Sequence, residues 1–187
     1  MIAYLLLLVA VLTRVLPHSG WMNFTAVGAA LLYFGARRPW REMAVPLAVL
    51  MTTDYYLTTF SYHFTFHWSA YVTTWAWYAA AMALGWILLS ARTTWVRVAA
   101  GAVLGPTSFF VVSNYAVWAG SGMYPHTLSG LGVCYLAGVP FYRNALTGDL
   151  LWSTVLFGSY ELFRLKAHRL NLDFMRFFGL RKIDFNG

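Results

Sequence analysis

Charged side chains are scarce in this sequence. Only 10% of the 187 residues are charged and six residues are acidic, whereas 60% are apolar. A soluble domain usually has about 25% charged and about 45–50% apolar residues, and disordered chains are rich in charge and poor in apolar residues. Both classes are therefore excluded. The remaining class is a membrane protein, and this length holds roughly six or seven spans of about 20 residues each.

Cysteine and the motifs of common enzyme classes are also rare or missing. Cys134 is the only cysteine, which excludes an intrachain disulfide. The sequence has no glycine-rich phosphate loop with lysine, no His-Glu-x-x-His and no Gly-x-Ser-x-Gly. Six acidic residues argue against an ion pump built from many carboxylates. We therefore expect no enzymatic activity.

Positive charge is in excess, with a formal net charge of +7. In a soluble protein this would indicate nucleic-acid binding. Membrane proteins, however, concentrate Lys and Arg in their cytoplasmic loops. We therefore expect the lipid bilayer as a partner, and no nucleic acid.

The apolar runs predict an all-α integral membrane protein with six transmembrane helices. They are too long and too uniformly apolar for the strands of a barrel. The expected helices cover residues 2–16, 23–36, 43–60, 69–90, 96–119 and 146–164. The first is read as a span that stays in the protein, because no cleavage site for a signal peptide follows it. Together they form a membrane domain, 1–165, followed by a basic amphipathic cytoplasmic tail, 166–187.

The basic residues predict the orientation of the bundle. Eleven of the 13 follow the second, fourth and last expected helices, as Arg37, Arg38, Arg41, Arg92, Arg97, Arg164, Lys166, Arg169, Arg176, Arg181 and Lys182. Loops 17–22, 61–68 and 120–127 contain no Lys or Arg. The positive-inside rule then places both termini in the cytoplasm and these three loops outside.

The apolar stretch 128–142 cannot be a full span if the chain has six spans and both termini in the cytoplasm. A seventh span would put the basic tail outside. The stretch is only 15 residues long, contains several glycines and includes Pro140 near its end. It predicts a re-entrant or interfacial segment that forms a wall of an outward-facing pocket. The alternative is a short seventh span whose tail departs from the positive-inside rule.

Most of the histidines fall on the expected outer side, as His18, His63, His67 and His126. His63 and His67 are four residues apart and would share one face of a helix. Imidazole is a common metal ligand and thiolate binds soft metals, so His63, His67 and Cys134 are the candidate metal ligands, with any cofactor unknown. The alternative is an interfacial belt of histidines among aromatic residues.

Polar side chains inside apolar helices are the second group of candidates. Ionisable groups within spans usually face a cavity or pair with each other, and a buried amide needs partners. With the three histidines His63, His67 and His126, the expected substrate-binding residues are Asp54, Asn114, Trp118, Tyr124 and Arg143. Asp149 opens the expected last helix, with Thr147 as a cap, and either stabilises that helix N-terminus or binds a ligand.

Several short segments carry a pattern that extends over nearly the whole chain up to about residue 165. They are Leu16-Pro17-His18, Asn23-Phe24-Thr25-Ala26-Val27-Gly28-Ala29, Thr53-Asp54-Tyr55-Tyr56-Leu57, Ser113-Asn114-Tyr115-Ala116-Val117-Trp118, Met123-Tyr124-Pro125-His126-Thr127-Leu128 and Gly138-Val139-Pro140-Phe141-Tyr142-Arg143-Asn144. The pattern resembles a bacterial membrane family that is assigned to transport and has no known function.

That family is similar to the substrate-binding S components of energy-coupling factor (ECF) transporters. Pro140-Phe141 and Gly148-Asp149-Leu150 look like the Pro-Phe and Gly-Asp-Leu signature at the start of the last S-component helix. S components are six-helix proteins that bind vitamins or metal ions in an outward-facing pocket. The resemblance implies a bacterial inner-membrane location and a small-molecule ligand. S components dock coupling subunits through an Ala-x-x-x-Ala pattern on their first helix, which is missing here, so the partners are either coupling subunits or none, as in a solitary transporter.

We therefore expect a transport protein that binds a small micronutrient, such as a vitamin, a corrinoid or a metal complex, for uptake. The alternative is a structural accessory subunit of a larger membrane complex, whose histidines and aromatic residues hold a pigment or lipid or only pack. A ligand retained by the solitary protein would favour transport. Stoichiometric co-purification with redox or pigment subunits would favour the accessory role.

Overall fold

All regular structure in the described part of the chain is helical. The computed structural model describes residues 2–16 and 23–177. The helices are α1 (Ile2–Val15), α2 (Val27–Arg37), α3 (Ala44–Tyr56), α4 (Val72–Leu89), α5 (Trp95–Gly120) and α6 (Leu128–Phe177), with short helical turns η1 (Trp40–Glu42), η2 (Leu57–Ser61) and η3 (Trp68–Tyr71). The prediction of an all-helical chain is confirmed, and each expected helix has a counterpart.

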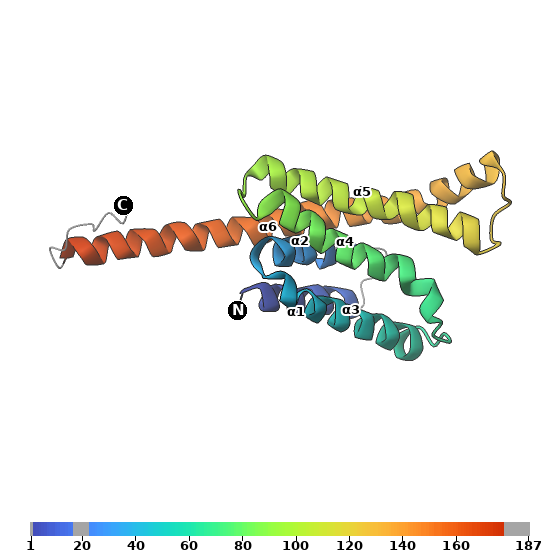
Figure 1. The fold of residues 1–187 in the computed structure, drawn as a ribbon, viewed down its shortest axis with the longest axis horizontal. Helices are drawn as coiled ribbons and strands as arrows, with labels where there is room; N and C mark the ends of the chain where they lie inside the picture. The colour runs from blue at the N-terminus through green and yellow to red at the C-terminus, as the bar shows by residue number, and fades with distance from the viewer. Residues whose placement is uncertain (1, 17–22, 178–187) are drawn as a thin grey trace.

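Helix α2 lies at the centre of the bundle (Figure 1). Every residue from Val27 to Ala36 is buried, because α1, α4, α5 and α6 all contact this helix. A helix that is apolar on all sides is stable only when it is covered on all sides. The segment's composition therefore fits its central position.

The backbones of α2 and α4 touch at two glycines. A Cβ added to Gly35 would lie 1.9 Å from the carbonyl oxygen of Met82, and one added to Gly85 would lie 2.2 Å from that of Leu32. Small residues permit this close approach of two helices, which increases their van der Waals contact. The backbones of α2 and α4 are therefore in direct contact at Gly35 and Gly85.

The segment 128–142 is not a separate re-entrant or interfacial segment, and our prediction of one was wrong. It forms the first part of α6, which continues through Pro140 without interruption. Proline inside a helix removes one backbone hydrogen bond, which is why the sequence indicated a break. Contacts with α5 support the helix here: the Tyr135 hydroxyl donates to the Val111 carbonyl oxygen at 2.7 Å, and Gly138 lies against Asn114.

The later part of α6 extends beyond the rest of the bundle (Figure 1). The helix passes the expected domain boundary at residue 165 without a break and ends at Phe177. Residues 178–187 of the expected amphipathic tail lie outside the described residues, as does His18.

A cluster of polar side chains joins the start of α1 to the connection between α2 and α3. The Tyr4 hydroxyl donates to Glu42, and Arg38 forms a bidentate ion pair with the same carboxylate, at 2.7 and 2.5 Å. The hydrogen bonds from Tyr4 and Arg38 lower the pKa of Glu42 below its usual value. This cluster ties the N-terminal helix to the end of the bundle that carries Arg38.

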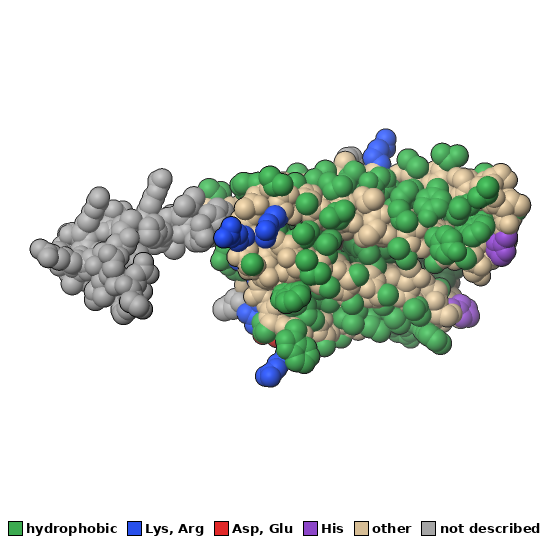
Figure 2. Space-filling model, turned by 45° about the horizontal axis from the view of Figure 1, so that its top comes forward, with side chains coloured by type: hydrophobic (Ala, Val, Ile, Leu, Met, Phe, Trp, Pro, Cys, Tyr) green, Lys and Arg blue, Asp and Glu red, His purple; other side chains and the backbone are tan. Residues whose placement is uncertain are grey.

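Two helical stretches in the described residues, Trp68–Leu89 and Trp95–Gly120, are long and apolar enough to cross a bilayer. They are a modest indication of membrane association, and α1 and α2 are apolar but shorter. Large apolar side chains also face outward, including Ile87, 65% exposed, and Leu136, 72% exposed. Figure 2 shows apolar side chains over most of the visible face, with Lys and Arg mainly at one end and His at the other.

Candidate functional site

A cavity of about 660 Å³ lies between the helices, beside the C-terminal end of α1 and the N-terminal end of α2. With 14 and 11 residues, α1 and α2 extend about 21 and 17 Å, whereas the 26 residues of α5 extend about 39 Å. Helices of very different length therefore meet beside the cavity. The cavity is lined by Arg14, Val15, Leu16, Asn23, Thr25, Val27, Gly28, Leu57, Ser61, Tyr62, Thr74, Trp77, Tyr78, Pro106, Phe109, Phe141, Ala145 and Asp149.

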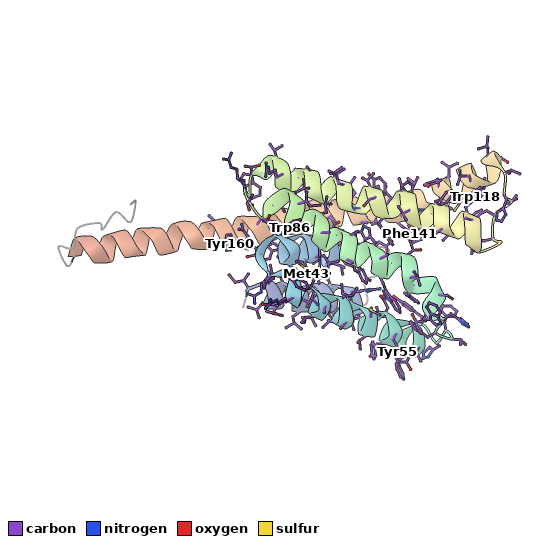
Figure 3. The ribbon with its side chains drawn as sticks, viewed as in Figure 1. Met43, Tyr55, Trp86, Trp118, Phe141 and Tyr160 are labelled. Atoms are coloured by element: carbon purple, nitrogen blue, oxygen red, sulfur yellow. The ribbon has the colours of Figure 1, made fainter. Side chains whose placement is uncertain are left out.

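Five of the eighteen residues that line the cavity are aromatic, and most of the others are apolar or uncharged. The Trp77 indole nitrogen donates to the Gly105 carbonyl oxygen at 3.0 Å, and its ring lies 4.8 Å from that of Phe109, centroid to centroid. Figure 3 shows Phe141 at mid-length of the bundle, whereas Tyr55 lies on the outer side of α3. Ligand sites are typically apolar with a few well-placed polar groups. This cavity has that composition.

Arg14 and Asp54 form an ion pair between α1 and α3, beside the cavity. The Asp54 side chain has no exposed surface, and the Arg14 side chain is 21% exposed. Arg14 also donates to the Tyr78 hydroxyl at 2.6 Å, and the Trp75 indole donates to Asp54 at 2.9 Å. Arg14 and Tyr78 line the cavity and Asp54 lies behind them. The charge of Arg14 is thus already balanced by protein.

Asp149 is the second buried carboxylate, and it reaches the cavity from α6. Only 4% of the residue is exposed. The backbone N–H of Ala29 donates to its carboxylate, and Ala26, which precedes α2, gives no side-chain cap. A Cβ on Gly28 would lie 2.2 Å from the carboxylate, so glycine is required at this position. Asp149 therefore caps α2, whose positive N-terminus favours an anion.

This position corrects our prediction that Asp149 opens the last helix with Thr147 as its cap. Helix α6 begins at Leu128, so Gly148 and Asp149 lie well inside it. The Thr147 hydroxyl donates to the carbonyl oxygens of Arg143 and Asn144 in its own helix. The helix N-terminus that Asp149 stabilises belongs to α2.

A smaller cavity of about 180 Å³ adjoins the first and contains Asn114. The two share Asn23, Pro106, Phe109, Phe141 and Ala145 in their walls. The Asn114 amide donates to the Phe110 carbonyl oxygen at 2.8 Å. Cys134, buried in α6, donates its thiol hydrogen to the Asn114 carbonyl oxygen at 3.3 Å. Asn114 thus has partners in its own helix and across the α5–α6 contact.

None of the three predicted histidines lines either cavity. His63 and His67 are exposed in the non-helical connection between η2 and η3, so they do not share a helix face. His126 is exposed in the α5–α6 connection, where its ring lies 5.4 Å from that of Trp118. Figure 3 shows Trp118 at this end of the bundle.

The remaining candidates are also outside the cavity linings. Tyr124 is half-buried in the α5–α6 connection, and Arg143 is exposed on α6. In the part of the chain that the structure describes, no three His, Cys, Asp or Glu side chains converge as a metal site would require.

Sequence reasoning did not select Arg14, Trp77 or Tyr78. Arg14 carries a signal that could have found it: it is the one cation inside the first apolar run, and Asp54 is the one acid inside the third. Opposite charges in two spans favour pairing. Trp77 and Tyr78 carry no such signal, because aromatic residues are common throughout this chain, at 19% of all residues.

The comparisons with known proteins identify a family and no closer relative. The model of a family of unknown function, DUF6580, matches residues 1–171. Because the match covers most of the chain, the protein belongs to this family. Neither the curated proteins nor the solved structures gave a significant match.

Proposed function

We propose that this DUF6580 protein is a multi-pass membrane protein that binds a small organic micronutrient in its central cavity for uptake. One observation carries the proposal: a cavity of about 660 Å³ that has aromatic residues, the half-buried Arg14 and the buried Asp149 in its wall. Buried charges inside apolar helices usually mark substrate or ion pathways. Ligand cavities typically measure about 300–1,000 Å³.

The distribution of charge supports the expected orientation. The α2–α3 and α4–α5 connections carry Arg38, Arg41 and Arg92 at one end of the bundle, and the histidine-bearing connections lie at the other. With α6 as one continuous helix, six helices return the chain to its starting side. The proposed topology therefore has both termini in the cytoplasm. Ser61 and Tyr62, at the histidine end of α3, line the cavity and favour an outward opening.

The cavity volume narrows the choice among micronutrients. It suits a ligand of one or two fused rings, the size of a simple vitamin. A corrinoid, with its macrocycle and nucleotide loop, is much larger, so the smaller class is preferred. The histidines do not line the cavity, so they give no additional support to a metal complex.

The proposal is tested by purifying the full chain in mild detergent and identifying retained small molecules by native mass spectrometry with metal analysis. Ala145→Phe places a ring in the cavity wall, whereas Ala137→Phe adds the same ring at an exposed position on the same helix. We expect a stoichiometric ligand in the wild type and in Ala137→Phe, and its loss in Ala145→Phe.

Two results would contradict this function. Equal ligand retention in Ala145→Phe and Ala137→Phe would place the ligand outside the cavity. An empty protein that co-purifies stoichiometrically with redox or pigment subunits would support the accessory role instead.

A further inference from the structure

The charges around the cavity do not balance. Arg14 is neutralised by Asp54, with further hydrogen bonds from Trp75 and Tyr78 to the same carboxylate. Asp149 has the Ala29 N–H as its hydrogen-bond donor. Among the side chains that the structure describes, no cationic group pairs with Asp149. Asp149 is therefore the buried carboxylate at the cavity that lacks a cationic partner, whereas Asp54 has one.

An uncompensated buried carboxylate is unfavourable. Moving an ion out of water carries a large penalty even after relaxation. The positive N-terminus of α2 offsets part of that penalty for the charged carboxylate. A cation bound in the cavity would offset the remainder.

Aromatic rings next to Asp149 suit the same kind of ligand. Both Trp77 and Asp149 lie against Gly105 on α5. The Gly105 carbonyl oxygen accepts the hydrogen bond from the Trp77 indole, and a Cβ added to Gly105 would lie 3.8 Å from Oδ2 of Asp149. Phe109 packs against Trp77 in the same wall. The faces of aromatic rings attract organic cations through the negative charge of their π-systems.

We propose that Asp149, Trp77 and Phe109 form a subsite for an organic cation, so that the substrate carries a protonated amine or a positively charged heteroaromatic ring. This inference rests on the proposed function and specifies its substrate class. The carboxylate supplies the counter-charge and the rings supply the flat walls. Gly28 leaves the space that the carboxylate occupies.

Three probes of nearly equal shape separate charge from size: N-methylquinolinium, neutral 1-methylnaphthalene and anionic 1-naphthoate. Their binding to the full chain in phosphatidylcholine nanodiscs is measured by native mass spectrometry, with protein-free nanodiscs as the control for partitioning. We expect wild type to bind N-methylquinolinium at least tenfold more tightly than the other two.

Two variants test the role of the carboxylate. Asp149→Asn keeps an oxygen that can accept from Ala29 and removes the charge, so it should lose the preference for the cation by at least tenfold. Asp149→Glu keeps the charge and should retain the preference. Thermal melting confirms that each variant is folded, and the wild-type selectivity remains decisive if Asp149→Asn fails to fold.

The outcomes separate this inference from the proposed function. Preference for 1-methylnaphthalene or 1-naphthoate overturns the cation subsite and leaves a binding cavity. Binding of none of the three also overturns it, while retention of a natural ligand by the purified protein would preserve the proposed function. An unchanged preference in Asp149→Asn would show that the carboxylate is not the counter-charge.

Discussion

Two buried carboxylates in this protein are stabilised in different ways. Asp54 has an arginine and two aromatic hydrogen-bond donors around it, and its side chain has no exposed surface. Asp149 faces the cavity with a helix N-terminus as its partner. A carboxylate satisfied by protein groups holds helices together, whereas one without a cation is available to a ligand. The first is therefore structural and the second is the group proposed to contact substrate.

At the level of single residues, Asp54→Asn should destabilise the fold by about 3–5 kcal/mol, because it leaves the half-buried Arg14 without a counter-charge. Replacing both members, as Arg14→Met with Asp54→Leu, should cost much less, since apolar replacements leave no unpaired charge. Denaturation in detergent measures both. A double variant as unstable as the single one would contradict the pairing seen here.

At the level of helices, the contact between α2 and α4 depends on the absence of a side chain. Gly35→Ala should destabilise the protein by about 1–3 kcal/mol, because its Cβ would meet the Met82 backbone and helices cannot move apart freely. Gly132 in α6 is the matched control: nothing lies within 4 Å of its Cβ position. Gly132→Ala should stabilise its helix by about 0.5–1 kcal/mol. Equal effects would show that the α2–α4 backbones are not in contact.

Helix positions could be predicted from sequence because apolar runs alternate along the chain with connections that contain Arg, His, Gly or Pro. The error at 128–142 arose from a local signal, since Pro140 normally interrupts a helix. The contact with α5 that keeps α6 continuous pairs Tyr135 with Val111, residues far apart in sequence. Local propensity carries no information about such a contact.

The site was harder to predict than the fold for the same reason. Asp54 and Asn114 stand out as polar residues inside apolar runs, and the structure places both near the cavities. The cavity is lined by residues from helices far apart in the sequence, and Asp149 acts on α2 across more than a hundred residues of chain. The histidines were selected for the chemistry of imidazole, yet residue type does not specify which connections between helices contribute side chains to a cavity.

For the whole molecule, the separation of cations and histidines at opposite ends predicts which loops face the cytoplasm. Single introduced cysteines can report this in a Cys134→Ala background, where the native, buried thiol has been removed. Thr65→Cys lies in the exposed histidine-end connection and Ala91→Cys in the exposed α4–α5 connection. In intact bacterial cells, a membrane-impermeant maleimide should label Thr65→Cys, and it should label Ala91→Cys only after permeabilisation. The reverse pattern would open the cavity to the cytoplasm and remove the basis for uptake. Labelling of both from outside would place the two connections on one side of the membrane, which a spanning α4 does not allow.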